Sequence, residues 1–215
     1  PMELLLAEEK GALSDVTKFR ASVSGAEMNV AVGLARLGLC PRFMTRLGDD
    51  PRAVRIRRFM QENGIADDLI ITDPAHLTGA MMKSKAEPGK HEIYYFRQDS
   101  AASFLCEQDV DRLDLTDIRA AHFTGIFPSI SPSAAEAARR LVKRAHESEI
   151  TVVFDPNLRC QLWGSSPETL SLLNEFAANS DVFLPSLKEA ETLCGLSEPE
   201  EIAEHYLDLG TKKVV

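Results

Sequence analysis

A short segment of the sequence offers three side chains that could act on a phosphate or a carboxylate. The apolar run Ile150–Phe154 is followed at once by Asp155–Arg159, which reads DPNLR and contains an acid, an amide and a guanidinium. The planar guanidinium of arginine donates two parallel hydrogen bonds to such anions. The spacing also allows a plainer structure, in which Asp155 caps a turn and Arg159 pairs with it. The segment therefore predicts either an anion site or a self-contained turn.

The stretch from Ser24 to Asn29 places small residues where a helix is expected to begin. Free backbone N–H groups at a helix start can bind an anion or sugar hydroxyl groups. The amide of Asn29, one turn further on, can both donate and accept hydrogen bonds. The alternative is simple capping of the helix by Ser24. The sequence leaves both interpretations open.

Two charged residues stand just beyond predicted strands. Arg97 follows the strand-forming segment 92–96 and could hold a carboxylate beneath a lid, or could be an exposed charge at a strand end. Glu189 lies in the first turn of a helix that follows a strand. There it could help to hold hydrated Mg²⁺, which keeps several waters and takes few protein ligands. Its alternative role is to stabilise the positive end of the helix dipole.

Composition excludes several classes of protein. The chain has 215 residues and a formal net charge of −9, which argues against a nucleic-acid partner because such proteins need basic patches. No apolar run approaches the ~20 residues that a membrane helix needs, and the first residues do not resemble a signal peptide. A cytoplasmic protein without a membrane partner is therefore expected. Motifs for dinucleotide binding, for a P-loop and for a nucleophile elbow are absent.

Helix signals and short apolar runs alternate along the chain, which predicts an α/β fold with a largely parallel sheet. In such sheets ligands bind beyond the carboxyl ends of the strands. That rule points to the loops at Gly125, at 155–159 and at 185–189. We expect helices at about 24–37, 51–63, 199–209 and from 131, 166 and 186 onward, with Asp50 and Ser186 as helix caps. Strands are expected at 121–124, 150–154, 182–184 and from 212.

The segment 78–97 has a different pattern. Strand-forming residues occupy 92–96, a turn is expected at 87–90, and no helix signal intervenes. We therefore predict a β-hairpin, which could act as a lid on an α/β body.

Taken together, these segments resemble the ribokinase-like (phosphofructokinase-B type) carbohydrate kinases. The first signature of that family, G-G-A-x-x-N-x-A-x-x-L-x-x-L-G, is matched by residues 24–38 with serine for the first glycine. The family's G-x-D turn is matched by Gly48–Asp50, and its later G-[VI] pair by Gly64-Ile65. The resemblance covers essentially the whole chain. It implies a ribokinase-like Rossmann-type sandwich with a central, mostly parallel sheet and a small β lid.

Within this family, the sequence is most similar to 2-keto-3-deoxygluconate kinases. It shares with them an aromatic pair and arginine at 95–97, a serine-alanine pair at 100–101, and the D-x-N-x-R pattern at 155–159. A Leu-Trp pair follows at 162–163. Serine replaces asparagine in the N-x-x-E magnesium motif, which here spans Ser186–Glu189.

The resemblance implies ATP-dependent phosphorylation of a sugar or sugar acid, with 2-keto-3-deoxygluconate as the expected substrate and ATP and Mg²⁺ as cofactors. Arg159 would be catalytic and would face both the substrate and the transferred phosphate. Asn157 and Leu158 would lie with it beside the nucleotide, and Glu189 would act on Mg²⁺ through water. The expected substrate contacts are Gly25, Ala26, Glu27, Met28, Asn29, Tyr95, Phe96, Arg97 and Arg159.

The resemblance also bears on domain organisation. We expect residues 1–215 to form a single domain that is cut short at both ends, with lid segments at about 9–23 and 76–103. The family's G-A-G-D motif, which supplies the anion hole and the catalytic base, does not occur in the sequence. Pairing of two lids into a homodimer is expected. The alternatives are a fructokinase or other carbohydrate kinase of the family, and a non-catalytic protein that binds sugar acids on the same fold.

Overall fold

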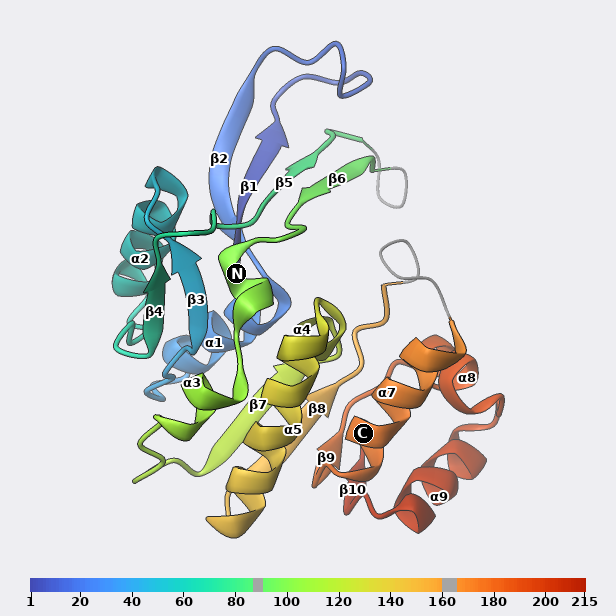
Figure 1. Cartoon of the computed structure of the whole chain (residues 1–215). Coiled ribbons are helices and arrows are strands. Elements are labelled where there is room, and N and C mark those ends of the chain that lie inside the picture. The colour runs from blue at the N-terminus through green and yellow to red at the C-terminus, as the bar shows by residue number, and fades with distance from the viewer. Residues whose placement is uncertain (87–90, 160–165) are drawn as a thin grey trace. The chain divides into compact units, whose positions relative to one another are not determined.

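The computed structural model describes residues 1–86, 91–159 and 166–215. The chain divides into two compact units, Pro1–Leu105 and Cys106–Val215, each with its own hydrophobic core (Figure 1). Both units mix helices and strands, so the predicted α/β class is confirmed. The turn predicted at 87–90 and the Leu-Trp pair at 162–163 lie outside the described residues.

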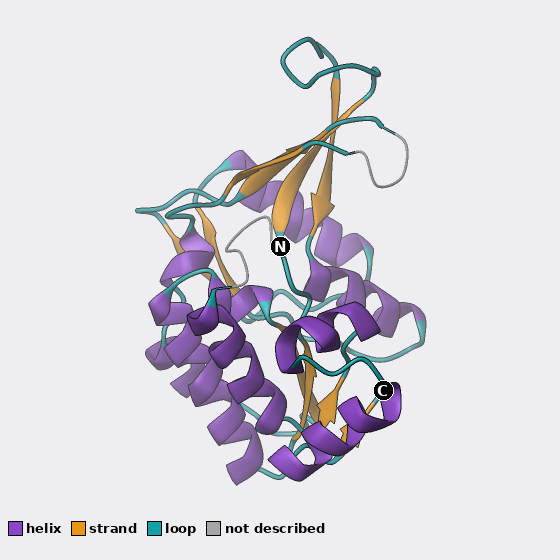
Figure 2. Cartoon of the chain, turned by 90° about the vertical axis from the view of Figure 1, so that its right-hand side faces the viewer, coloured by secondary structure: helices purple, strands orange, loops and turns teal. Residues whose placement is uncertain are grey.

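A four-stranded sheet, called the N-terminal sheet below, dominates the first unit. Its strands are ordered β2-β1-β5-β6. The predicted hairpin is confirmed, because β5 and β6 pair antiparallel with Ala80 opposite Phe96. Figure 2 shows the outer ends of these strands projecting beyond the helices of the unit. The strands are β1 (Met2–Ala7), β2 (Phe19–Ser24), β5 (Ala80–Lys83) and β6 (Ile93–Phe96).

Strand β1 was not predicted. Its sequence, MELLLA, consists of residues that favour helices when considered alone. It becomes a strand because it pairs antiparallel with β2 on one side and parallel with β5 on the other. These partners lie far away in the sequence, so local propensity is overridden by sheet pairing.

The rest of the first unit contains α1 (Ala26–Arg36), β3 (Thr45–Gly48), α2 (Pro51–Glu62), β4 (Ile70–Asp73) and the short helix η1 (Ala101–Phe104). Strands β3 and β4 pair in parallel. Asp50 caps α2 by accepting a hydrogen bond from Ala53 N, as the sequence predicts. The core of this unit consists of Met28, Ala31, Phe43, Leu47, Ala53, Ile56, Met60 and Ile65.

The second unit is built on a parallel sheet with the strand order β10-β9-β8-β7. The predicted strands are confirmed as β7 (Ala120–Thr124), β8 (Thr151–Asp155), β9 (Val182–Phe183) and β10 (Lys213–Val214). The described helices are α3 (Glu107–Asp111), α4 (Ile126–Ser129), α5 (Pro132–Glu147), α7 (Pro167–Ala178), α8 (Leu187–Cys194) and α9 (Pro199–Leu209).

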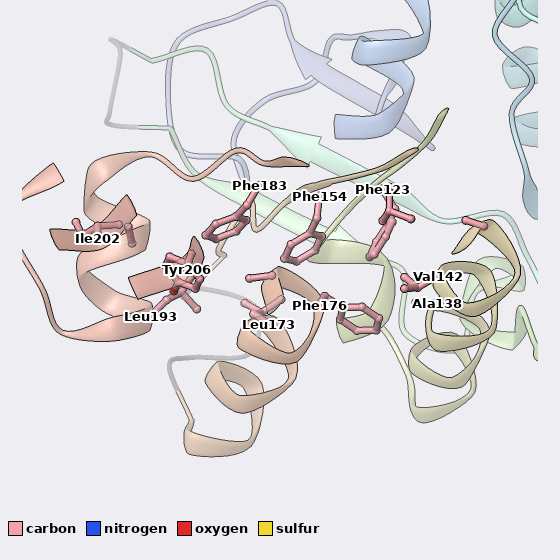
Figure 3. Packing of buried hydrophobic residues seen from close by; sticks show 14 of the residues in the cluster. Phe123, Ala138, Val142, Phe154, Leu173, Phe176, Phe183, Leu193, Ile202 and Tyr206 are labelled. Atoms are coloured by element: carbon pink, nitrogen blue, oxygen red, sulfur yellow. The ribbon is translucent and has the colours of Figure 1, made fainter. Parts of the chain in front are cut away.

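A row of aromatic rings fixes this sheet against its helices. Phe123, Phe154 and Phe183 come from three adjacent strands and point to the same side (Figure 3). The ring of Phe176 in α7 meets Phe123 edge-on with centroids 5.3 Å apart, and Tyr206 in α9 lies 4.5 Å from Phe183. The packing therefore holds the strands in place immediately before the loops at their carboxyl ends.

In the ranges that the structure describes, no helix is both long enough and apolar enough to cross a membrane.

Candidate functional site

The loop after β8 folds around the carboxylate of Asp155. Its Oδ1 accepts a hydrogen bond from the backbone N–H of Asn157 at 2.9 Å, and its Oδ2 accepts one from Asn157 Nδ2 at 3.2 Å. Asn157 has a φ of 41°, a left-handed conformation that asparagine adopts more readily than most residues. The turn of the plainer interpretation is therefore present. The ion pair of that interpretation is not seen among the described residues, and the side chain of Arg159 is exposed.

Glu189 joins this loop to the next one. Its Oε1 accepts a hydrogen bond from Leu158 N at 2.7 Å. Its Oε2 accepts two more from Ser186, from the backbone N at 3.0 Å and from Oγ at 2.5 Å. Ser186 and Glu189 form a capping box at the start of α8, so the predicted cap is confirmed. A single carboxylate thus fixes the loops that follow two adjacent strands.

The electrostatics of this edge favour a positive charge. Burial raises the pKa of Asp155 above its usual value, and the negative charge of Glu189 adds to the rise. Hydrogen bonds from Asn157 and the charge of His122 act in the opposite direction without cancelling it. Two carboxylates that repel each other in a partly desolvated place would be stabilised by a cation.

One buried acceptor at this edge lacks a partner. Within the described part of the chain, Oδ1 of Asn157 accepts no hydrogen bond. Leaving such a group unsatisfied costs about 1–3 kcal/mol, and a metal-bound water or a ligand N–H would satisfy it. The same described ranges contain no cluster of three His, Cys, Asp or Glu side chains that could hold a bare metal ion. The carboxylates of Asp155 and Glu189, together with this acceptor, suit a hydrated cation, which binds through its waters and takes few protein ligands.

Gly125 is a part of this site that sequence reasoning marked only as a loop position. Its backbone N–H donates to the carbonyl oxygen of Asp155 at 2.8 Å. A Cβ atom on Gly125 would lie 2.2 Å from the carbonyl oxygen of Pro156 and 2.5 Å from Cδ2 of Leu173. Its φ of −59° suits any residue, so lack of space rather than conformation requires glycine here.

The first unit holds the other candidates, beginning at the start of α1. Ser24 is the last residue of β2 and pairs with Met2. Gly25, with a φ of 155°, precedes α1. Among the described residues, no side-chain hydrogen bond caps the N-terminus of α1. Capping by Ser24 is therefore wrong, because the pairing of β2 holds that residue in the sheet. The positive φ explains why glycine stands at this exit from the strand.

Alternation along β6 divides the aromatic segment between two faces of the N-terminal sheet. The guanidinium carbon of Arg97 lies 5.3 Å from the ring centre of Tyr95, so these two side chains share one face. Phe96 points to the other face and is 52% exposed. Gly79 lies beside Arg97, because an added Cβ at Gly79 would stand 3.3 Å from the Cβ of Arg97.

Strand β1 lies between the start of α1 and Arg97. An added Cβ at Gly25 would stand 3.0 Å from Cα of Pro1, which precedes β1. Two residues further on, Glu3 N donates to the carbonyl oxygen of Gly79 at 3.0 Å, and Gly79 lies beside Arg97. Within the first unit, the first residues of the chain therefore connect the predicted substrate contacts at the start of α1 with those next to β6.

Comparison with known proteins gives a consistent result. A family model described as pfkB family carbohydrate kinase matches residues 2–215. A 2-dehydro-3-deoxygluconokinase from Bacillus subtilis (strain 168) is 33% identical over 214 residues, covering 99% of this chain and 66% of the relative. The chain thus spans about two thirds of the length of that relative.

Two solved structures extend the comparison. A PfkB protein from Polaromonas sp. JS666 is 37% identical with a TM-score of 0.94, covering 100% of this chain and 72% of that one. A 2-dehydro-3-deoxygluconokinase from Thermotoga maritima is 26% identical with a TM-score of 0.86, covering 96% of this chain and 65% of that one.

The packing at Gly125 gives a test of the site's construction. Gly125→Ala should lower the free energy of unfolding by about 1–3 kcal/mol, because the methyl group has to displace the Pro156 carbonyl. Urea denaturation measures the change.

Gly33→Ala is the matched control: Gly33 is exposed within α1, and apart from the neighbouring backbone of α1 itself no described atom lies within 4 Å of the point that an added methyl group would occupy. That variant should gain about 0.5–1 kcal/mol. Equal effects of both substitutions would contradict the packing argument.

Proposed function

The chain belongs to the pfkB family of carbohydrate kinases, and on that basis we propose that its protein transfers phosphate from ATP to a hydroxyl group of 2-keto-3-deoxygluconate. This sugar acid is also called 2-dehydro-3-deoxygluconate. The observation that carries the proposal is the similarity, over nearly the whole chain, to the Bacillus subtilis kinase of that name. The arginines at positions 97 and 159 suit a substrate and a co-substrate that are both anionic.

In the second unit, the loop after β8 is assigned to the phosphates. Arg159 would donate to the transferred phosphate, and Asn157 and Leu158 would lie with it beside the nucleotide. The unpaired Oδ1 of Asn157 supports this assignment, since it needs a donor from a bound group. Glu189 would hold hydrated Mg²⁺ through water. When bound, that ion would offset the negative charge that builds up on the phosphates.

In the first unit, Gly25 to Asn29 and the Tyr95–Arg97 segment are assigned to the sugar acid. Backbone N–H groups at the start of α1 would bind its hydroxyls, and Arg97 would pair with its carboxylate. The ring of Tyr95 lies against the Arg97 guanidinium in a cation–π contact. Because this contact already restricts the rotamers of Arg97 in the free protein, less side-chain entropy is lost when the substrate binds, which favours affinity. Phe96 points to the opposite face of β6 from Arg97, so we leave it out of this assignment.

Phosphoryl transfer of this kind depends mainly on positioning and charge neutralisation. The family resemblance assigns the base to the aspartate of a G-A-G-D motif, which does not occur in residues 1–215. To the residues of this chain we therefore assign binding, orientation and charge neutralisation only.

Substrate preference can be tested with the intact protein in a coupled ADP-release assay against sugar acids and neutral sugars. We expect 2-keto-3-deoxygluconate to be the best substrate. Arg97→Ala should lower kcat/KM for it on the order of tenfold to a hundredfold, because a charge-assisted hydrogen bond is lost, and should affect neutral sugars much less. Arg20→Ala removes an exposed arginine from the same sheet and serves as the control. A preference for fructose would favour the fructokinase alternative. If no sugar were turned over at all, the alternative of a non-catalytic protein that binds sugar acids would be favoured.

The role of Arg159 can be tested separately. Arg159→Ala should reduce kcat on the order of a hundredfold, because the developing phosphate charge loses its donor. Its side chain is exposed, so the far-ultraviolet circular dichroism spectrum and the urea midpoint should stay unchanged. Lys188→Ala, an exposed cation in α8, should leave turnover close to normal. Normal turnover in Arg159→Ala would refute the assignment.

We also propose a homodimer that pairs through the N-terminal sheet. Tyr94 and Phe96 lie on one face of β6 and are 62% and 52% exposed, which is unusual for large aromatic side chains. Tyr94→Ser should shift sedimentation velocity profiles of the intact protein toward the monomer. Leu209→Ser, which changes an apolar residue of α9 that is 47% exposed, should not shift these profiles. Identical profiles for the wild type and Tyr94→Ser would argue against this interface.

A further inference from the structure

Thr78 is the residue at which the chain enters β5, and it is only 1% exposed. All three of its polar groups bind residues at the junction from the end of β3 to the first turn of α2. Its backbone N–H donates to Oδ2 of Asp50 at 2.7 Å, and its Oγ1 accepts from Gly48 N at 2.9 Å. Its carbonyl oxygen accepts from the guanidinium of Arg52 at 3.0 Å. One residue is thus held from three directions.

Asp50 serves two elements at once. Its Oδ1 caps α2 through Ala53 N at 2.9 Å while its Oδ2 holds Thr78. Burial on its own would raise the pKa of Asp50, but the hydrogen bonds from Thr78 and Ala53 outweigh it and lower the pKa. Gly48 completes the arrangement, since a Cβ there would lie 2.6 Å from Asp50 Oδ2 and 2.9 Å from Thr78 N.

The contacts continue from Thr78 to Arg97. Gly79, the next residue, accepts a hydrogen bond from Glu3 N at 3.0 Å and lies against the Cβ of Arg97. On the other side of Thr78, the carbonyl oxygen of Leu77 accepts a hydrogen bond from Ala101 N at 2.9 Å. The backbone on both sides of Thr78 is therefore tied to β1 and to the segment that follows Arg97. A shift of Thr78 would be transmitted to Arg97 through one residue.

We propose that Thr78 and Asp50 are positioning residues that fix Arg97 for an acid substrate by anchoring β5 to the turn between β3 and α2. The inference rests on the proposed function, because Arg97 is there assigned to the carboxylate of the substrate. Neither residue touches the substrate in this scheme. Both act through the backbone of Gly79.

Thr78→Val and Thr78→Ser separate the hydrogen bond from the shape of the side chain. Valine keeps the branched shape but leaves the buried N–H of Gly48 without its acceptor, whereas serine retains the hydroxyl. Thr78→Val should raise KM for the sugar acid about tenfold with kcat within about twofold, because one buried bond is lost and Arg97 is displaced. Thr78→Ser should restore a near-normal KM. Thr72→Val, the same change at an exposed threonine of β4, is the control.

A double-mutant cycle distinguishes positioning from general destabilisation. If Thr78 acts through Arg97, Thr78→Val should change KM little further in an Arg97→Ala background. Additive effects on KM, or an unchanged KM in Thr78→Val alone, would overturn the inference. Asp50→Asn provides a second variant. It keeps one carbonyl oxygen for the cap of α2 but not both acceptors, so it should shift KM in the same direction.

Hydrogen exchange measured by mass spectrometry gives a readout that does not depend on catalysis. Peptides that cover 79–83 and 93–97 should exchange faster in Thr78→Val than in the wild type or Thr78→Ser, and peptides from the second unit should not change. If the wild type turned over no sugar acid, the proposed function would fail, but this measurement would still test whether Thr78 anchors β5. Unchanged exchange in both peptides would refute the anchoring.

Discussion

Where the backbone leaves a sheet, its N–H groups need new acceptors, and in this chain partly buried carboxylates provide several of them. Asp155 accepts from Asn157, Glu189 from Leu158 and Ser186, and Asp50 from Thr78 and Ala53. The loops after β8 and β9 and the junction of β3 with α2 are thus each fixed by an acidic residue that does not itself have to react. Charge-assisted bonds of this kind are about twice as strong as neutral ones, which makes such loops rigid enough to orient a ligand.

The loops that these carboxylates hold also depend on close packing. Gly125 leaves room for the Pro156 carbonyl, and Gly48 leaves room for Asp50 and Thr78. In both places, a methyl group would push the loop away from the strand before it. The aromatic row of Phe123, Phe154 and Phe183 supplies the rigid base in the second unit. Carboxylate, glycine and core together fix the position of a loop that has no regular structure.

The sequence predicted features that depend on neighbouring residues and missed those that depend on distant ones. The caps at Asp50 and Ser186 could be identified because the acceptor and its N–H lie within one turn. Strand β1 could not, because its helix-favouring residues become a strand only through pairing with β2 and β5. Capping by Ser24 stayed open as an alternative for the same reason, although pairing with β1 holds Ser24 in the sheet.

The candidate site shows the same division. The side chains at 155–159 could be selected from residue type alone, but the acceptors that fix this loop could not. The contacts of Gly125 with Pro156, and of Glu189 with Leu158, join segments about thirty residues apart and leave no local pattern. Likewise, the alternation that separates Phe96 from Tyr95 and Arg97 follows from β6 being paired.

The two interpretations of Glu189 turn out not to be alternatives. Its oxygens accept three hydrogen bonds from Leu158 and Ser186, which is a structural role. A carboxylate offers about four acceptor sites, so capacity remains for a metal-bound water. The fixed geometry would in fact aid such a role, because an oriented carboxylate loses no freedom when the ion binds. Glu189 can therefore fix the loop that carries Arg159 and also, as proposed, hold the hydrated Mg²⁺ beside the phosphates.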